Sequence, residues 1–73
     1  MTPFLVRARI PGLGPTPEGA MTLYVAMFET EQEALDAVTA AVPPEWVVEE
    51  VVGRAPDSLV QRRKIGPGSL EQL

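Results

Sequence analysis

Two arginines and two glutamates are the residues of this chain whose types and spacing could do chemistry together. Glu49 and Glu50 are adjacent within an apolar run, and Arg7 and Arg9 stand two residues apart in another. Because successive side chains of a strand point to opposite faces, one of the glutamates must be partly buried. We expect that glutamate to pair with Arg7 or Arg9 from a neighbouring strand, which contributes about 0.2 to 1 kcal/mol. The alternative is a carboxylate that acts as a general acid or base.

Catalysis is disfavoured by the residue types that the chain lacks. Its 73 residues include no cysteine and no histidine, so the usual thiol nucleophile, the usual general base and the nitrogen and sulfur ligands of a zinc site are missing. Nucleophilic catalysis would need Ser58, Ser69 or a threonine, activated by Lys64, the only lysine. We therefore predict a protein that is not an enzyme and holds no cofactor and no metal. An enzyme that relies on Glu49 or Glu50 is the weaker alternative.

A basic run near the end of the chain is a candidate for anion binding. Arg62, Arg63 and Lys64 could contact a phosphate group or an acidic partner. They could equally complement the negative end of a short helix, and we favour this interpretation because the chain offers no basic face with aromatic stacking platforms. The glycine-rich residues 11–20 could also receive an anion, but Pro17 occupies the position of the third glycine in the dinucleotide-binding pattern. A small regulatory domain that binds an anion or nucleic acid through either segment is our alternative function.

The overall charge argues against nucleic acid and membrane surfaces as partners. Ten acidic residues oppose six basic ones, which gives a formal net charge of −4 and a field that repels polyanions. The acids around the expected helix, Glu29, Glu31, Glu33 and Asp36, are interpreted as a solvated face rather than a magnesium site. The apolar stretches are far shorter than the roughly 18 residues of a membrane span. The first residues also lack the basic-then-apolar order of a secretory signal, so we expect a cytoplasmic protein.

Three strands are needed to position these residues. Residues 4–10 alternate cleanly and predict a first strand, with apolar side chains at the even positions and Leu5, Arg7 and Arg9 at the odd ones. Residues 21–28 predict a second strand whose two faces are both apolar. Residues 46–52 predict a third strand, in which the adjacent glutamates require a bulge or an edge position.

Two helices are predicted from their end signals. Thr30 followed by Glu33 matches the capping box, so the main helix is expected from Thr30 to Val42, just before two prolines. Asp57 or Ser58 could cap a short second helix. Residues 66–68 break that helix, and residues 66–73 are expected to form a final turn or a flexible tail.

These elements predict one α+β domain over residues 1–73, with the order β-β-α-β-α. The helical crossover makes the second and third strands parallel, and a hairpin makes the first two antiparallel. With the first strand in the middle, the order is 2-1-3 in a three-stranded mixed sheet, and the main helix covers the even positions of the first strand. The opposite face is left to solvent, to the C-terminal segment or to a second protomer. Solvent alone is disfavoured because three short strands make a thin core.

This open face carries our functional prediction. Arg7 and Arg9 lie on it beside one of the glutamates, together with either Tyr24 and Phe28 or the alternate residues of the second strand. A half-apolar face of this kind is typical of a contact surface. We predict a protein-interaction or adaptor module that is also able to self-associate as a homodimer, with the contact residues Arg7, Arg9, Tyr24, Glu49 and Glu50.

Three stretches of the chain resemble small uncharacterised bacterial proteins. They are PFLVRARIPG at residues 3–12, VPPEWVVEEVV at residues 42–52 and KIGPG at residues 64–68. The likeness extends over most of the chain and includes no catalytic or ligand-binding motif. The resemblance implies a bacterial cytoplasmic protein and assigns no activity, cofactor or partner.

Overall fold

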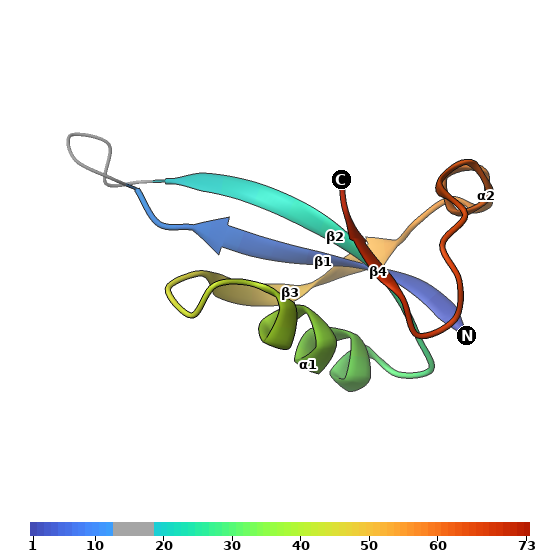
Figure 1. Ribbon diagram of the computed structural model, residues 1–73, viewed down its shortest axis with the longest axis horizontal. Coiled ribbons are helices and arrows are strands. Elements are labelled where there is room, and N and C mark those ends of the chain that lie inside the picture. The colour runs from blue at the N-terminus through green and yellow to red at the C-terminus, as the bar shows by residue number, and fades with distance from the viewer. Residues whose placement is uncertain (13–18) are drawn as a thin grey trace.

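The computed structural model describes residues 1–12 and 19–73, which form an antiparallel sheet with two helices (Figure 1). The strands are β1 (Thr2–Ile10), β2 (Ala20–Phe28), β3 (Val47–Arg54) and β4 (Leu70–Gln72), and the helices are α1 (Glu31–Ala41) and α2 (Asp57–Arg63). The strand order across the sheet is β3-β1-β2-β4, and every neighbouring pair is antiparallel.

The predicted α+β class and the position of β1 between β2 and β3 are confirmed, but the three-stranded mixed sheet is wrong in two respects. Helix α1 connects β2 to β3, so these strands run in the same direction, yet β1 separates them and no parallel pair forms. The sheet also has a fourth strand, β4, in the segment expected to be a turn or a flexible tail. Its flanking backbone N–H groups donate to β2, from Gly68 to Met27 O at 2.7 Å and from Leu73 to Leu23 O at 2.9 Å. The C-terminal segment is thus extended because it satisfies edge groups of β2.

Helix α1 begins and ends where its capping residues predict. Thr30 Oγ1 accepts a hydrogen bond from the backbone N–H of Glu33 at 3.2 Å, which satisfies one of the orphan amides of the first turn. Val42 is the C-cap and has an extended backbone. Pro43 follows it and cannot continue the helix. The predicted helix from Thr30 to Val42 is therefore confirmed, with both named residues as its caps.

The larger apolar core lies between α1 and the face of the sheet that carries the even-numbered residues of β1. Its buried members are Phe4, Val6, Tyr24, Ala26, Ala34, Val38 and Val42. Tyr24 is only 8% exposed, so our placement of Tyr24 on the open face is wrong. The physical reason is the register: Tyr24 is paired with Val6, and directly paired residues of neighbouring strands share a face.

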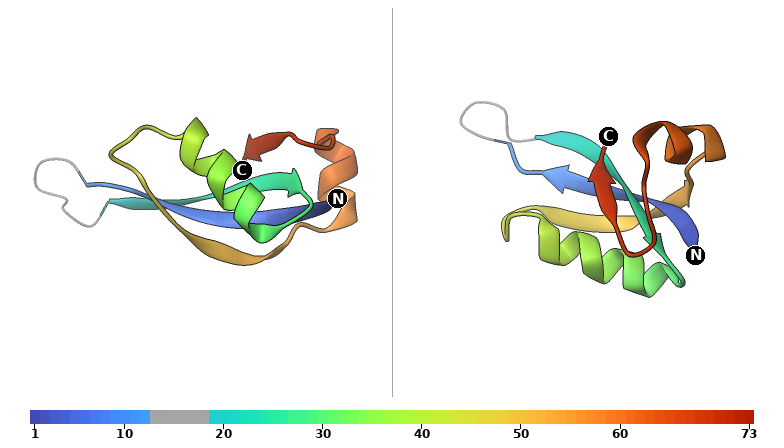
Figure 2. Two further views of the ribbon diagram at one scale, coloured as in Figure 1. Left: turned by 90° about the horizontal axis from the view of Figure 1, so that it is seen from below. Right: turned by 45° about the vertical axis from the view of Figure 1, so that its right-hand side comes forward.

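Helix α2 covers part of the opposite face, at the end of the sheet where β1 begins and β2 ends (Figure 2). A second buried cluster forms there from Val25, Met27, Ala55 and Ile65, with Leu5, Leu59 and Val60 packed against it. The C-terminal segment is therefore one cover of this face, as we considered from the sequence. Among residues 1–12 and 19–73, none covers the other end of the same face, where Met21 and Val47 are half exposed.

The N-terminal end of α2 differs from the sequence prediction, whereas the predicted basic residues do lie at its C-terminal end. Neither Asp57 nor Ser58 caps the helix, because its N-cap is Pro56 and no side chain accepts a hydrogen bond from the first turn. At the other end, Lys64 adopts the left-handed conformation, with φ 54° and ψ 47°. A glycine is the usual residue at such a position, since a Cβ atom is disfavoured there.

Candidate interaction site

A β-bulge in β3 brings both glutamates to the arginine side of the sheet. The register shifts between Arg7, which is opposite Glu50, and the next pair, which contains Val48, so Glu49 is the extra residue. Val48 and Val51 both pack on the core beneath α1, although residues three apart in a regular strand point to opposite faces. The bulge resolves this conflict by adding one residue between them. Because β3 is also an edge strand, the predicted bulge and the predicted edge position are both confirmed.

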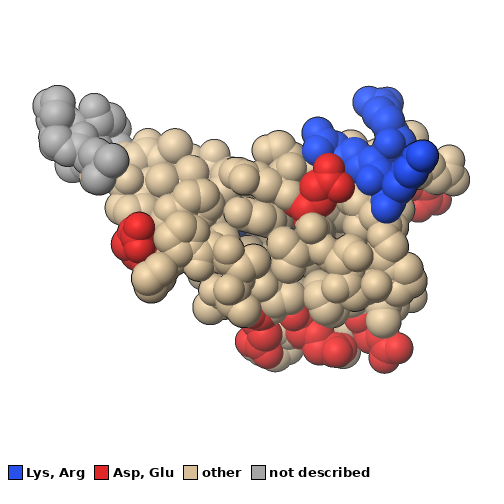
Figure 3. Space-filling model, in the orientation of Figure 1, with Lys and Arg blue, Asp and Glu red and all other residues tan. Residues whose placement is uncertain are grey.

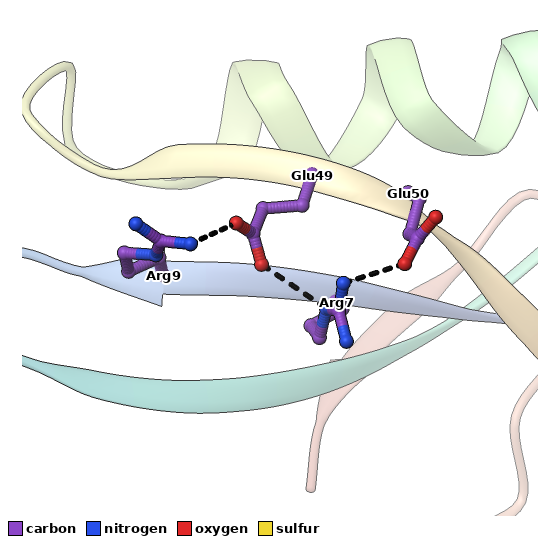
Figure 4. A network of polar contacts seen from close by, with 4 residues as sticks. All are labelled: Arg7, Arg9, Glu49 and Glu50. Carbon is purple, nitrogen blue, oxygen red and sulfur yellow. Dashed lines mark hydrogen bonds and ion pairs between the residues drawn. The ribbon is translucent and has the colours of Figure 1, made fainter.

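Glu49 lies at the centre of an ion-pair network (Figure 4). Its Oε2 accepts a hydrogen bond from Arg9 Nη2 at 2.6 Å, and its Oε1 lies 3.0 Å from Arg7 Nε. Glu50 Oε1 accepts a hydrogen bond from Arg7 Nη2 at 2.5 Å. The Glu49 side chain is 18% exposed and that of Glu50 is 58% exposed, so Glu49 is the partly buried one. The predicted pairing of these glutamates with Arg7 and Arg9 is confirmed.

One contact of this network is electrostatic without being a hydrogen bond. Arg7 Nε and Glu49 Oε1 are close enough for an ion pair, yet neither of these buried atoms has a hydrogen-bond partner in the part of the chain that the structure describes. The two atoms are close enough to attract each other, but the angle at the N–H is too small for a hydrogen bond, which needs the N–H to point at the acceptor. Arg7 is thus held by charge through two of its nitrogens, Nε and Nη2.

The third guanidinium nitrogen of Arg7, Nη1, points away from both glutamates (Figure 4). Arg7 is also one wall of a pocket of about 450 Å³, whose other walls are Met21, Thr22, Leu23 and Leu73. A guanidinium carries five N–H donors in a rigid fork. Because Nε and Nη2 of Arg7 face the glutamates of β3, the N–H groups of Nη1 remain as donors for an acceptor that enters the pocket.

The part of the sheet that α2 leaves uncovered consists of two rows of side chains. Met21, Val47 and Leu73 are half exposed, at 51%, 54% and 41%. The ion-pair network lies between them, and its charges cancel because two arginines meet two glutamates. We call this surface the open half-face. Its first row is Val47, Arg9 and Met21, and its second row is Glu50, Arg7, Leu23 and Leu73. Glu49 is the extra residue that the bulge adds beside these rows. The open half-face is therefore apolar at three of its four corners, charged at Glu50, and balanced in side-chain charge.

The remaining basic side chains gather around α2, and acidic side chains gather on the α1 side of the molecule (Figure 3). Arg63 Nη1 pairs with Glu71 Oε1 at 2.8 Å. Arg54, Arg62 and Lys64 form no ion pair with any other residue that the structure describes. The basic run predicted as an alternative anion contact thus exists as a surface cluster. The other alternative, residues 11–20, falls largely on residues 13–18, outside the described residues.

Sequence reasoning leaves the apolar part of the open half-face unassigned. Both faces of β2 are apolar, so its composition does not decide whether Leu23 or Tyr24 faces α1. Leu73 escapes notice because a strand of three residues is too short to show an alternation. Val47 could have been assigned from its own strand, since it precedes Val48 and adjacent residues point to opposite faces.

No family model, no curated protein and no solved structure matches this chain. Among residues 1–12 and 19–73, no three or more Asp or Glu side chains are placed to hold a metal ion. Within the same residues, no helix has the length and apolar character that crossing a membrane requires. Any function must therefore be argued from the surfaces described above.

Proposed function

We propose that this protein is a non-enzymatic interaction module that binds a protein partner through the open half-face. The observation that carries the proposal is the pocket beside Arg7, which joins an apolar lining from Met21, Leu23 and Leu73 to an arginine already fixed in place. Binding pockets combine an apolar lining with a few oriented polar groups in this way. Of the predicted contact residues, Arg7, Arg9, Glu49 and Glu50 remain in the proposal, and Tyr24 is replaced by the apolar residues of the pocket.

A partner other than a second copy is favoured by the size of the open half-face. The first row crosses three strands and the second crosses four, so the open half-face measures roughly 13 Å by up to 19 Å, or about 220 Å², from the spacings of a sheet. A stable dimer buries about 800 Å² on each partner. The open half-face alone is therefore too small to hold two copies together, whereas it is large enough to receive one segment of another protein.

The chemistry of the network also supports binding over catalysis. Each carboxylate of the network faces an arginine within 3.0 Å, and an arginine stays protonated in proteins and cannot take up a proton from it. The carboxylates therefore neutralise the arginines and fix their positions. This arrangement orients Arg7 for recognition without providing a proton-transfer pair.

Site-specific photo-crosslinking tests the proposal. A photo-reactive methionine analogue at position 21 is compared with the same analogue at position 1, because Met21 and Met1 are similarly exposed, at 51% and 62%. In an extract of the cells that produce the protein, we expect a discrete adduct from position 21. Excess unlabelled protein should suppress this adduct, and excess Met21→Lys protein should not. Equal labelling from both positions, or no competable adduct, would contradict the proposal.

A second candidate function is anion binding at the basic cluster of α2. It is favoured by the absence of ion pairs to Arg54, Arg62 and Lys64 within the described residues. If phosphate groups bind there, affinity for an oligonucleotide should fall steeply with salt, and replacing Arg62 and Lys64 by glutamine should flatten this dependence. A matched control is the double variant Arg7→Gln, Arg9→Gln, which lies on the open half-face. No binding at low salt would end this candidate.

A further inference from the structure

The open half-face has the dimensions of one helix. Its two rows are together roughly 13 Å wide, and an α-helix with its side chains is about 10 to 12 Å wide. The sheet already carries two helices, of which α1 runs along the strands (Figure 1). Helix α1 covers the opposite face, and α2 covers the adjacent end of the same face through Leu59 and Val60. A third helix on the open half-face would lie beside α2, and the two helices would together cover this face of the sheet.

Backbone hydrogen bonding favours a helix over an extended segment. A peptide strand that lies flat on the face of a sheet cannot bond to it, because the N–H and C=O groups of the sheet point toward neighbouring strands. Its own backbone groups would then be buried without partners, which costs free energy. A helix satisfies its backbone groups internally and presents only side chains. Backbone hydrogen bonding therefore excludes a single extended strand. A second sheet and a helix both satisfy their own backbone groups, and of these two the helix matches a surface only two rows of side chains wide.

The side chains of the half-face define the chemistry of that helix. Met21, Leu23 and Leu73 require an apolar stripe, with residues spaced three and four apart. Near the middle, Arg7 offers the nitrogen that Glu49 and Glu50 do not use. A carboxylate there would meet the charges of both glutamates, whereas a neutral amide oxygen accepts from Arg7 without that repulsion. A glutamine or asparagine within the stripe meets both requirements.

We infer that the partner of this protein presents an amphipathic helix of about three turns, with an apolar stripe interrupted by one neutral amide side chain. The length follows from the second row, which spans about 19 Å across four strands, at 1.5 Å per residue. This inference rests on the proposed function, because it names the kind of partner that binds the same surface. It differs from that proposal in committing to one secondary structure and one polar residue type.

Synthetic peptides test the inference against the chain of residues 1–73. The probe is an end-capped peptide of about 14 residues with leucines at positions 3, 6, 10 and 13, one central glutamine at position 7, and alternating Glu and Lys elsewhere, roughly the length the half-face requires. One control has the same composition with the leucines spread around the helix, and a second has proline at position 7. Binding is followed through backbone amide NMR shifts. We expect saturable shifts at Arg7, Met21, Leu23 and Leu73, and an affinity at least about tenfold weaker for either control.

Two variants locate the site. Met21→Lys should weaken binding of the probe by about tenfold or more, because it puts a strongly hydrated charge where the apolar stripe must lie. Met1→Lys should leave binding unchanged. Met1 is a similarly exposed methionine just before the start of β1, whereas Met21 is paired with Arg9 near the end of β1. Equal binding of the probe and the spread-leucine control, shifts centred on α1, or no shift at millimolar peptide would each overturn the helix. If the adduct at position 21 forms while the probe fails, the helical partner is wrong and the interaction module stands; if the adduct also fails, both are wrong.

Discussion

The two faces of the sheet differ in how completely they are covered. Beneath α1, Val6 and Val38 are fully buried in a continuous apolar core. On the opposite face, α2 covers one end, and Met21 at the other end is half exposed beside an ion-pair network. The alternation of β1 is the common origin of both faces, because its even positions are apolar and its odd positions include Arg7 and Arg9. The difference teaches that the buried apolar residues lie beneath α1 and at the α2 end of the other face, while the open half-face keeps exposed side chains.

The largest expected effect is on the face beneath α1. Val38→Ala removes buried methyl groups and leaves a cavity, so we expect the free energy of unfolding to fall by about 2 to 4 kcal/mol. Val47→Ala, at a side chain 54% exposed on the open half-face, should change it by less than about 0.5 kcal/mol. Urea denaturation of both variants checks the contrast. Equal losses would show that the faces do not differ in their contribution to stability.

The second prediction separates the two glutamates. Glu49 contacts both arginines and Glu50 contacts one, and Glu49 is the more buried. Glu49→Gln should therefore lower the free energy of unfolding by about 1 kcal/mol, and Glu50→Gln by less than about 0.5 kcal/mol, since exposed pairs contribute little. High salt should reduce the effect of Glu50→Gln by a larger fraction than that of Glu49→Gln, because salt screens exposed charges more than partly buried ones. An equal cost for the two variants would contradict the central position of Glu49.

How far these features follow from the sequence depends on whether the chemistry is local. Thr30 and Glu33 define the start of α1 because capping involves residues three apart, and the adjacent glutamates indicate the bulge because alternation fails within their own strand. The face of Tyr24 does not follow from the sequence, because it depends on the register between β1 and β2. Strand β4 does not follow either, because its extended backbone is imposed by edge groups of β2 and not by its own residues. Features that depend on partners distant in the sequence are therefore the ones that sequence analysis does not predict.

A third prediction concerns the helices that cover the two faces. Thr30→Ala removes the side-chain cap of α1 and should lower the free energy of unfolding by about 1 kcal/mol. Ser58→Ala in the first turn of α2 should have almost no effect, because no side chain caps that helix. Thermal unfolding followed by circular dichroism measures both. A comparable loss from Ser58→Ala would mean that α2 depends on a cap that the structure does not show.

The smallest expected effect has the opposite sign. Lys64→Gly relieves the left-handed conformation at the end of α2, while the added freedom of glycine in the unfolded chain offsets part of the gain. We expect a net stabilisation of about 0.5 kcal/mol, measured by urea denaturation. Lys64→Ala is the control, since it removes the charge and keeps the Cβ atom. A stabilisation of equal size in the control would assign the effect to charge and not to conformation.

The bulge of β3 has a consequence for how molecules of this protein meet one another. An outer strand with a regular ladder is a template onto which further chains can assemble into fibrils. In β3 the register shifts twice along its length, beside Glu49 and again between the partners of Leu5 and Val6. These irregularities interrupt the regular row of N–H and C=O groups with which an added strand would have to pair. The bulge that brings the two carboxylates together therefore also disfavours aggregation at this edge of the sheet.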